Sequence, residues 1–332
     1  MSSMVKRGIL IGLLLLIVSG ITIYFTIDLD SLATLGTFNF TSLLLAMVAL
    51  ALGMYFDGLR LQRLVRMGGY SLSLIAILRV IFGNYFMAML TPGASGGAVA
   101  QALILRSYHV PIGKAAPIVL VRTVFSILFL IIMLPFILVT EPIDVPYITN
   151  SQLIGISIFV VISTFMGMYL LQTRLMKCLV TWICKITKKG NPKGWLIKLD
   201  EFNGGLSLLY ANPMQSFIVF IESALSLLFL YAIAPALMYA FTSDISIVEI
   251  LNRMILLNLI LYFAPTPGGT GVAEGLFVYL FASFVPIGTV GLVAVAWRIV
   301  AEYVPFFIGM YSVFTLYGQH IASSVSTSSE EV

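Results

Sequence analysis

Charged residues are the scarcest class in this sequence. Asp, Glu, Lys and Arg make up only 10% of its 332 residues, whereas hydrophobic residues make up 60%. A soluble globular domain carries roughly 25% charged residues, so a chain with a mean hydropathy of +1.06 lacks the polar surface that water requires. This balance excludes a soluble enzyme or binding module and predicts a protein that is dissolved in lipid.

Motifs for catalysis and cofactor binding are also missing. The only two cysteines, Cys178 and Cys184, have no metal-ligand spacing, and we expect both to be reduced thiols. The sequence contains no G-x4-G-K-[ST], H-E-x-x-H or G-x-S-x-G motif, which argues against an ATPase, a zinc protease and a serine hydrolase. We therefore expect no cofactor, no metal site and no catalytic residues in this chain.

Apolar runs recur along the chain at the length of about 20 residues that crosses a hydrocarbon core about 30 Å thick. The first run follows Lys6 and Arg7 as a signal peptide would, but it lacks a small-residue cleavage site, so we interpret it as a helix. The predicted fold class is an all-α polytopic membrane protein. Its apolar segments are 9–27, 41–57, 71–91, 96–107, 115–139, 151–172, 213–242, 247–265, 269–284 and 289–317.

The loops between these segments sort by the sign of their charge. By the positive-inside rule the basic side is cytoplasmic, so we expect both termini in the cytoplasm of a cell with this protein in its cytoplasmic membrane. This topology explains the net charge of +4 without a nucleic-acid partner. The basic group is Lys6, Arg7, Arg60, Arg63, Arg66, Arg106, Lys114 and the run from Arg174 to Lys198, and the acidic group is Asp28, Asp30, Glu141, Asp144 and Asp244.

Two pairs of segments must enter and leave the membrane on the same side for this sorting to hold. Residues 71–107 then form one re-entrant or broken-helix hairpin, and residues 247–284 form another. The alternative is ten full spans, which would place the stretch from Arg106 to Lys114 on the same side as Asp28, so we favour hairpins. Their tips are the Pro-Gly breaks Thr91-Pro92-Gly93-Ala94-Ser95-Gly96-Gly97 and Thr266-Pro267-Gly268-Gly269-Thr270-Gly271.

Landmarks around the two breaks recur at nearly the same offset. The offsets predict an inverted repeat of two helix-helix-hairpin-helix halves, 8–139 and 150–317, with a binding site near the midplane where the halves meet. Residues 174–205 are predicted to be a cytoplasmic amphipathic linker within the second half, and 322–332 a disordered tail. The landmark pairs are Arg79 and Arg253 (174 residues apart), Asn84 and Asn258 (174), Pro92 and Pro267 (175), and Arg122 and Arg298 (176).

Each break offers the start of a helix to a ligand. A broken backbone is tolerated in a membrane only where it faces protein or water. The helix that restarts has unpaired N–H groups and a positive dipole end, which suits an anion such as phosphate. Close packing of helices through small residues is the alternative explanation of the glycines. Two breaks at corresponding positions favour the anion site, which comprises Pro92, Gly93, Gly96, Gly97, Pro267, Gly268, Gly269 and Gly271.

Four arginines, Arg79, Arg122, Arg253 and Arg298, are the Lys and Arg residues that do not lie in predicted cytoplasmic segments. An arginine at mid-bilayer costs roughly 2.5–3.5 kcal/mol, so each needs a partner or a route to water. Arg79 and Arg253 can snorkel from a helix end, although they and the nearby Asn84 and Asn258 are also candidate site residues. We expect Arg122 to bind a ligand phosphate, because it has no carboxylate one turn on.

Arg298 and two acids complete the intramembrane charges. Arg298 is also a candidate phosphate ligand, although Glu302 one turn on can pair with it structurally. Glu222 and Glu274 are the other acids, and Glu274 follows the second break within two turns. Glu274 can neutralise an arginine, bind a cationic headgroup or carry a coupling proton, and we favour the structural partner of an arginine.

At the two breaks the sequence resembles the membrane region of lysylphosphatidylglycerol synthases. This flippase-like domain family includes the membrane half of multiple peptide resistance factors and many stand-alone proteins. The resemblance covers roughly residues 8–317, and Ala98 departs from the acidic or amide residue that often follows the first Gly-Gly in the family. The motifs that carry it are Thr91-Pro92-Gly93 with Gly96-Gly97, and Pro267-Gly268-Gly269 with Gly271 and Glu274.

The resemblance implies a flippase that moves anionic or aminoacylated phospholipids, or polyprenyl-phosphate lipids, across the cytoplasmic membrane. The sequence ends at Val332, soon after its last apolar segment, so we expect no soluble domain that transfers an amino acid from tRNA, and no enzyme activity. A separate lipid-modifying enzyme is then a candidate partner. Two alternatives stay open, namely a transporter for a small soluble anion and the membrane subunit of a lipid-modifying enzyme.

Overall fold

A computed structural model of the chain describes residues 39–140 except Pro92, residues 149–171, and residues 212–329 except Ser243, with isolated positions between 178 and 207. Every regular element in this described part is a helix, which confirms the all-α fold class. The predicted helix 9–27, Pro92, four of the five acidic loop residues and most of the predicted linker 174–205 lie outside the described residues.

The helices coincide with the apolar segments of the sequence. Their order along the chain is α2 (Phe40–Met67), α3 (Leu74–Met89), α4 (Ser95–Ser107), α5 (Ile112–Thr140), α6 (Asn150–Leu171), α9 (Pro213–Tyr231), α10 (Ile233–Met238), α11 (Ile247–Leu261), α12 (Val272–Phe281), α13 (Val290–Arg298), the π-helix η2 (Ile299–Tyr303) and α14 (Val304–Ser329).

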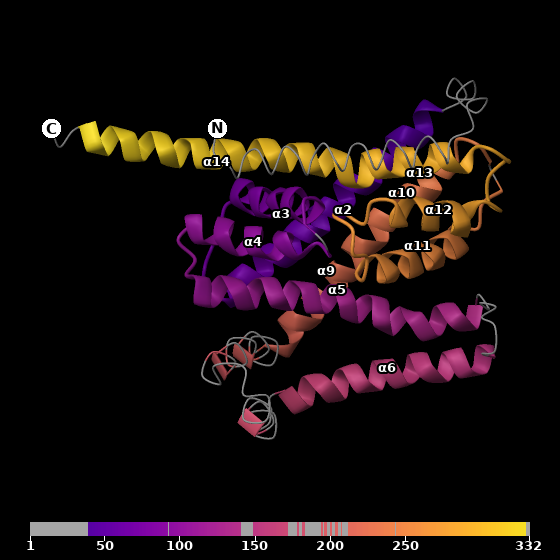
Figure 1. Cartoon of the computed structure of the whole chain (residues 1–332), viewed down its shortest axis with the longest axis horizontal. Coiled ribbons are helices and arrows are strands. Elements are labelled where there is room, and N and C mark those ends of the chain that lie inside the picture. Colours follow the sequence, from indigo (N-terminus) through magenta and orange to yellow (C-terminus); the bar gives the residue numbers. More distant parts are fainter. Residues whose placement is uncertain are drawn as a thin grey trace. The chain divides into compact units, whose positions relative to one another are not determined.

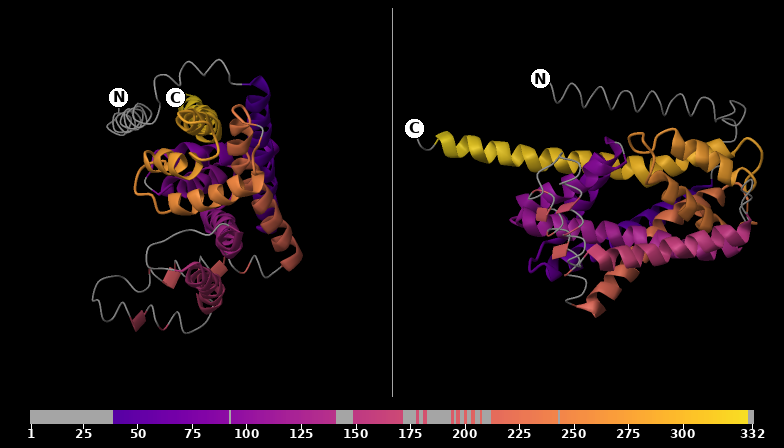
Figure 2. Two further views of the ribbon diagram at one scale, coloured as in Figure 1. Left: turned by 90° about the vertical axis from the view of Figure 1, so that its right-hand side faces the viewer. Right: turned by 60° about the horizontal axis from the view of Figure 1, so that its bottom comes forward.

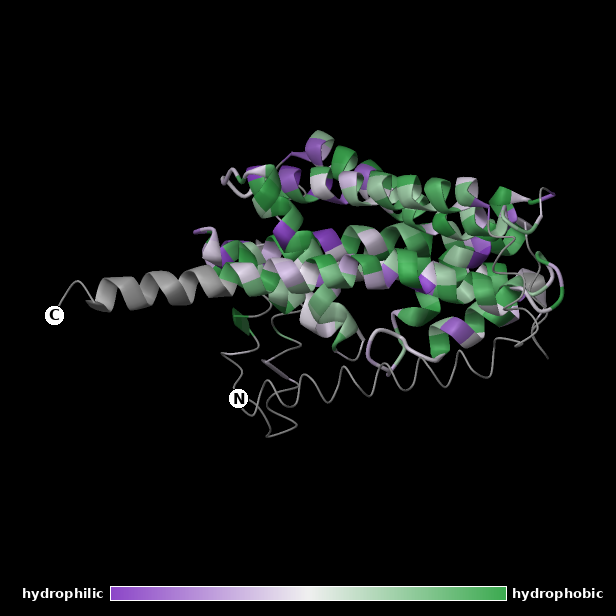
Figure 3. Cartoon of the chain, turned by 90° about the horizontal axis from the view of Figure 1, so that it is seen from above, coloured by the Kyte–Doolittle hydropathy of each residue, from purple (hydrophilic) through white to green (hydrophobic). Residues whose placement is uncertain are grey.

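Four of these helical stretches are long and apolar enough to cross a membrane, namely Phe40–Met67, Ile112–Thr140, Pro213–Met238 and Val290–Leu316. Hydrophobic residues predominate along the helices, as Figure 3 shows. Large apolar side chains such as Phe136, Phe159 and Tyr311 are exposed, which water would disfavour and lipid favours. The structure therefore agrees with an α-helical membrane protein.

The described chain divides into two compact units, and the boundary between them passes through α2 and α9. Of the described residues, the first unit comprises 39–58, 72–109 and 225–329, and the second comprises 59–71 and the described part of 110–224. Both predicted hairpins belong to the first unit, except for Ser71 at the start of the first hairpin.

In the first unit α3 lies between α4 and α14, and it packs against both (Figure 1 and Figure 2). Small residues allow this close approach. A Cβ atom at Gly83 would collide with Ile104 of α4, and one at Gly309 of α14 would collide with the backbone of Phe82. In the second unit α5 and α6 pack side by side (Figure 1).

Two pairs of short helices occupy the places predicted for hairpins. α3 and α4 have 16 and 13 residues, and α11 and α12 have 15 and 10. At 1.5 Å per residue the longest reaches about 24 Å, which is less than the roughly 30 Å of a hydrocarbon core. The two breaks therefore join helices that are each too short to span, as a hairpin requires. Their entry from opposite membrane faces stays a prediction, as does the inverted orientation of the two halves.

Two helix ends differ from the predictions. The sequence placed the end of an apolar segment at 57 and Arg60, Arg63 and Arg66 beyond it, whereas α2 continues to Met67 and includes all three. The helix continues because partners for Arg60 and Arg63 lie within the second unit. The tail predicted to be disordered from 322 is helical to Ser329, and no glycine or proline follows Gly318 to end α14.

Candidate functional site

The first break reverses the chain between α3 and α4 through two left-handed residues. Gly93 has a φ of +59° and Ala94 a φ of +53°. A Cβ atom at Gly93 would meet nothing within 4 Å, so this glycine serves the backbone conformation and not helix packing. The Thr91 Oγ1 accepts the Gly96 N–H at 2.8 Å and thereby caps the start of α4.

The next two glycines of this break serve helix packing. A Cβ atom at Gly96 would lie 2.6 Å from the Cγ2 of Thr91. One at Gly97 would lie 3.0 Å from the Cβ of Ala88 and would collide with the Asn84 side chain. Close approach of α4 to α3, the alternative explanation of the glycines, therefore accounts for Gly96 and Gly97.

The second break repeats the backbone conformation of the first and adds a carboxylate. Gly268 has a φ of +59°, and Gly269 and Gly271 also have positive φ, at +67° and +84°. The Gly271 N–H donates to Glu274 Oε2 at 2.7 Å, so Glu274 caps α12. At α12 the protein's own carboxylate thus takes the Gly271 N–H, one of the donors predicted to bind an external anion, and anion binding at this helix start stays a prediction.

Arg298, at the end of α13, joins this carboxylate to the break. It is only 1% exposed. Its Nε donates to Glu274 Oε1 at 3.0 Å, its Nη2 donates to the carbonyl of Gly268 at 2.9 Å, and it pairs with Glu302. The predicted structural pairing of Glu274 with an arginine is confirmed. The Arg298 guanidinium, which was predicted to bind phosphate, is thus bonded to groups of the protein.

The two breaks meet in the first unit. A Cβ atom at Gly268 would lie 3.0 Å from the Cγ of Met89, the last residue of α3, and 3.3 Å from its carbonyl oxygen. A pocket of about 270 Å³ adjoins this contact, with Gly93 and Ala94 of the first break and Thr266, Gly268 and Gly269 of the second break in its wall. The rest of the wall comprises Tyr85, Ala88 and Met89, Leu227 and Tyr231, Asn258, Leu261, Tyr262 and Ala264, and Glu302.

Glu302 is the charged member of this wall, and the sequence identified it only as a pairing partner of Arg298. Its side chain is 25% exposed, against 2% for Arg298 and 4% for Glu274. It lies in η2, and π-helical turns inside longer helices are frequent at functional sites. Thr266, another polar residue of the wall, has a buried Oγ1 that makes no hydrogen bond within the described part of the chain. The pocket therefore combines apolar walls with one accessible acid.

The repeated asparagines have different roles. Asn258 lines the pocket, where its amide donates to the carbonyl of Met254 at 2.8 Å. Asn84 belongs to α3, and its Oδ1 accepts from the Nε2 of Gln101 in α4 at 2.7 Å. The structure thus brings only one of the pair to the pocket.

The repeated arginines before the breaks hold the hairpins closed at the ends away from the tips. Arg79 donates to the Tyr108 hydroxyl at 2.9 Å, and Arg253 donates to the carbonyl of Leu280 at 2.7 Å. Arg253 also lies 4.5 Å from the ring centroid of Phe284. Each arginine thus joins the start of the first helix of its hairpin to the end of the second, which assigns both a structural role.

Arg122 lies in α5 of the second unit, where it is 6% exposed. It has an interaction within the described part of the protein, so its burial does not by itself require a ligand. Ser126, one turn on, donates to the carbonyl of Arg122 at 3.2 Å and accepts from Arg60 Nη1 at 2.8 Å. Phosphate binding by Arg122 stays a prediction.

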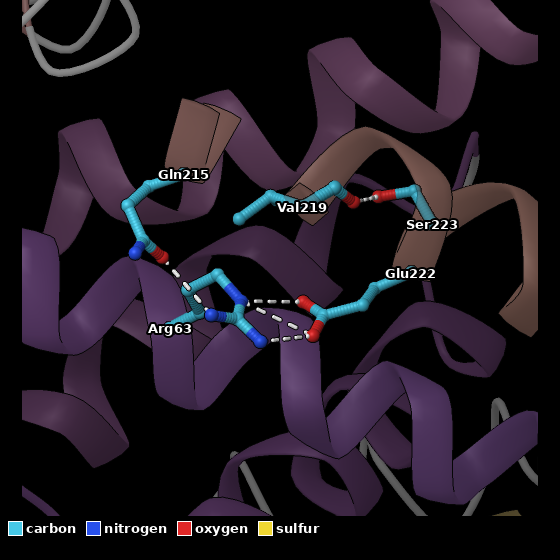
Figure 4. A network of polar contacts seen from close by, with 5 residues as sticks. All are labelled: Arg63, Gln215, Val219, Glu222 and Ser223. Atoms are coloured by element: carbon cyan, nitrogen blue, oxygen red, sulfur yellow. Dashed lines mark hydrogen bonds and ion pairs between the residues drawn. The ribbon is translucent and has the colours of Figure 1, made fainter. Parts of the chain in front are cut away.

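The intramembrane acid Glu222 also has a partner in the second unit, which Figure 4 shows. Arg63 of α2 donates from Nη2 to Glu222 Oε1 at 2.7 Å and from Nε to both carboxylate oxygens at 3.1 Å. Its Nη1 donates to the side chain of Gln215 at 2.9 Å. This bidentate pair braces α2 against α9 and explains why an acid is tolerated there.

The structure is that of a polytopic α-helical membrane protein. It has apolar helices of membrane-spanning length and two hairpins that are broken at Pro-Gly turns and share a pocket. The family described as lysylphosphatidylglycerol synthase TM region matches residues 8–309, and the chain belongs to this family. A UPF0104 membrane protein of Archaeoglobus fulgidus is 22% identical over 267 residues, which cover 77% of this chain and 80% of the relative. The family resemblance at the two breaks is thereby confirmed.

Proposed function

We propose that this protein is a lipid transporter that moves an anionic or aminoacylated phospholipid, or a polyprenyl-phosphate lipid, across the cytoplasmic membrane. The headgroup passes through the pocket at the two breaks, and the acyl chains stay in the surrounding lipid. The observation that carries the proposal is a partly polar pocket, bounded by both breaks, within apolar helices. Its volume of about 270 Å³ is just below the range of ligand pockets, which run from roughly 300 to 1,000 Å³, so it fits a headgroup better than a whole lipid.

The chemistry of the pocket favours a headgroup that carries an amine. The carboxylate of Glu302 attracts an ammonium group through a charge-assisted hydrogen bond. Tyr85, Tyr231 and Tyr262 also line the pocket, and the faces of tyrosine rings attract cations. Because the described wall of the pocket contains the acid Glu302 and neither Lys nor Arg, an aminoacylated or other amine-bearing phospholipid suits the site better than a small soluble anion.

Liposomes that contain the purified full-length protein provide the test. Phosphatidylethanolamine labelled on an acyl chain is expected to cross the bilayer faster than phosphatidylglycerol with the same label, as measured by bleaching of the outer leaflet. Glu302→Gln is expected to slow phosphatidylethanolamine by roughly 10- to 100-fold, since a hydrogen bond to a charged group contributes about 1.5–3 kcal/mol.

Glu249→Gln is the matched control, because Glu249 is an exposed acid in the first turn of α11. This variant is expected to transport lipid at the rate of the unmodified protein. Lipid movement no faster than in protein-free liposomes would contradict the proposed function. Equal rates for the two headgroups would contradict only the preference for an amine.

A further inference from the structure

The charges behind the pocket do not balance. Two carboxylates, those of Glu274 and Glu302, share the single guanidinium of Arg298. Glu274 is occupied at both oxygens, by Arg298 and by the Gly271 N–H. The three side chains therefore carry one excess negative charge, and Glu302 is the member that is accessible from the pocket. An unbalanced charge in a low-dielectric interior is costly, so the cluster is poised to take up one monovalent cation at Glu302.

We propose that Glu302 exchanges a proton for the ammonium group of the cargo, which couples lipid movement to a proton gradient. This inference rests on the lipid transport proposed above. In the empty pocket the carboxyl group of Glu302 holds the proton. An amine-bearing headgroup arrives already protonated, its ammonium group replaces that proton at the carboxylate, and the proton leaves to water. One positive charge replaces another, so the three side chains and their bound cation stay neutral before and after the exchange.

The same guanidinium connects this exchange to the contact between the breaks. Arg298 pairs with Glu302 and also donates to the carbonyl of Gly268. Gly268 in turn lies against Met89 at the end of α3. When Glu302 turns toward an ammonium group, Arg298 is left with Glu274 and the Gly268 carbonyl. Binding of an ammonium group in the pocket therefore changes the partners of Arg298, which is bonded to the second break at the point where that break contacts α3.

The neighbours of Glu302 leave it as the group suited to the exchange. Arginine does not lose its proton in proteins, and a phenol ordinarily stays protonated at neutral pH. Glu274 is buried and has both oxygens bonded within the protein. Among the described residues, Arg298 of α13 and Glu274 of α12 interact electrostatically with Glu302, and Tyr303 of η2 interacts with Arg298. Tyr85 of α3, Tyr231 of α9 and Tyr262 after α11 line the same pocket as Glu302.

The test measures protons released when the purified full-length protein in weakly buffered detergent binds a short-chain phosphatidylethanolamine. We expect release of about one proton per bound lipid, and an apparent affinity that falls by up to about tenfold per pH unit as acid competes for the carboxylate. Phosphatidylglycerol with the same chains is expected to release none. Glu302→Gln is expected to bind the amine lipid weakly and without proton release.

Glu302→Asp keeps the carboxylate and is expected to retain proton release, which separates the exchange from damage to the fold. Binding of phosphatidylethanolamine by the unmodified protein without proton release, at an affinity independent of pH, would overturn the exchange and leave lipid transport standing. Absence of both lipid binding and transport by the unmodified protein would overturn the proposed function and this inference with it.

Discussion

Gly268 and Met89 lie in contact, such that a Cβ atom on Gly268 would come within 3.0 Å of the Met89 side chain. Gly268 belongs to the second break, and Met89 is the last residue of the helix before the first break. This contact brings two separate sequence motifs to one place, and the pocket lies beside it. Changes at the contact should therefore affect both stability and transport.

Gly268→Ala tests the contact directly. The left-handed φ of +59° costs an alanine about 1–2 kcal/mol, and the added Cβ atom meets Met89 as well. We expect a lower melting temperature in detergent and slower lipid movement in liposomes. Gly275→Ala is the control, because a Cβ atom there would meet nothing within 4 Å and the residue lies inside α12. Identical melting and transport for the two variants would show that the contact is unimportant.

Arg298→Ala should be among the most destabilising single changes in the first unit. It leaves Glu274 buried without its cation, and removal of one partner from a buried pair costs about 3–5 kcal/mol. Arg253→Ala removes a hydrogen bond to a carbonyl and a contact with the Phe284 ring, for a loss of about 1–2 kcal/mol. Thermal unfolding in detergent should rank them in that order, and the reverse order would contradict the assigned roles.

Gly97→Ala should loosen the first hairpin. The added methyl group would collide with Asn84 and lie 3.0 Å from Ala88, and overpacking of this kind costs about 1–3 kcal/mol. Gly113→Ala, where a Cβ atom meets nothing within 4 Å near the start of α5, should be neutral or stabilising. The melting temperatures of the two variants are compared in detergent. A Gly97→Ala protein as stable as the unmodified one would contradict the packing role and favour the predicted role of Gly97 in the anion site.

Arg63 and Glu222 should be coupled in a double-mutant cycle. The pair is bidentate, yet the Arg63 side chain is 31% exposed, so we expect a coupling energy of only about 1–2 kcal/mol. The cycle compares the unfolding free energies of Arg63→Ala, Glu222→Ala and the double variant. Additive losses would mean that the bonds in Figure 4 contribute nothing to the stability of the second unit.

Much of the fold could be predicted because lipid imposes simple requirements on a sequence. Apolar runs located the helices, and the Pro-Gly turns at residues 92–93 and 267–268 follow the ends of α3 at Met89 and of α11 at Leu261. The ends of α2 and α14 were less predictable, since Arg60 and Arg63 continue a helix when partners distant in sequence accept their hydrogen bonds. An apolar pattern contains no information about those partners.

The site was predicted only in part, because roles depend on contacts that spacing does not specify. Gly93 of the first break, Gly268 and Gly269 of the second break and Asn258 do line one pocket. Glu302 was assigned only to Arg298, since nothing in the sequence signals the π-helical turn that places it in the pocket wall. Arg79 and Arg253 occupy corresponding positions in the two halves, which suggested site residues. In the structure each of them makes a hydrogen bond that joins the two helices of its own hairpin.

Blocking the pocket with a covalent group tests most directly whether lipid passes between the breaks. After replacement of Cys178 and Cys184 by serine, a cysteine is introduced by Ala94→Cys in the pocket wall or by Ile287→Cys in the exposed loop before α13, and each is treated with a charged thiol reagent. The account predicts that modification at position 94 abolishes most lipid movement in liposomes, whereas modification at position 287 leaves it unchanged. Full transport by the protein modified at position 94 would contradict the account.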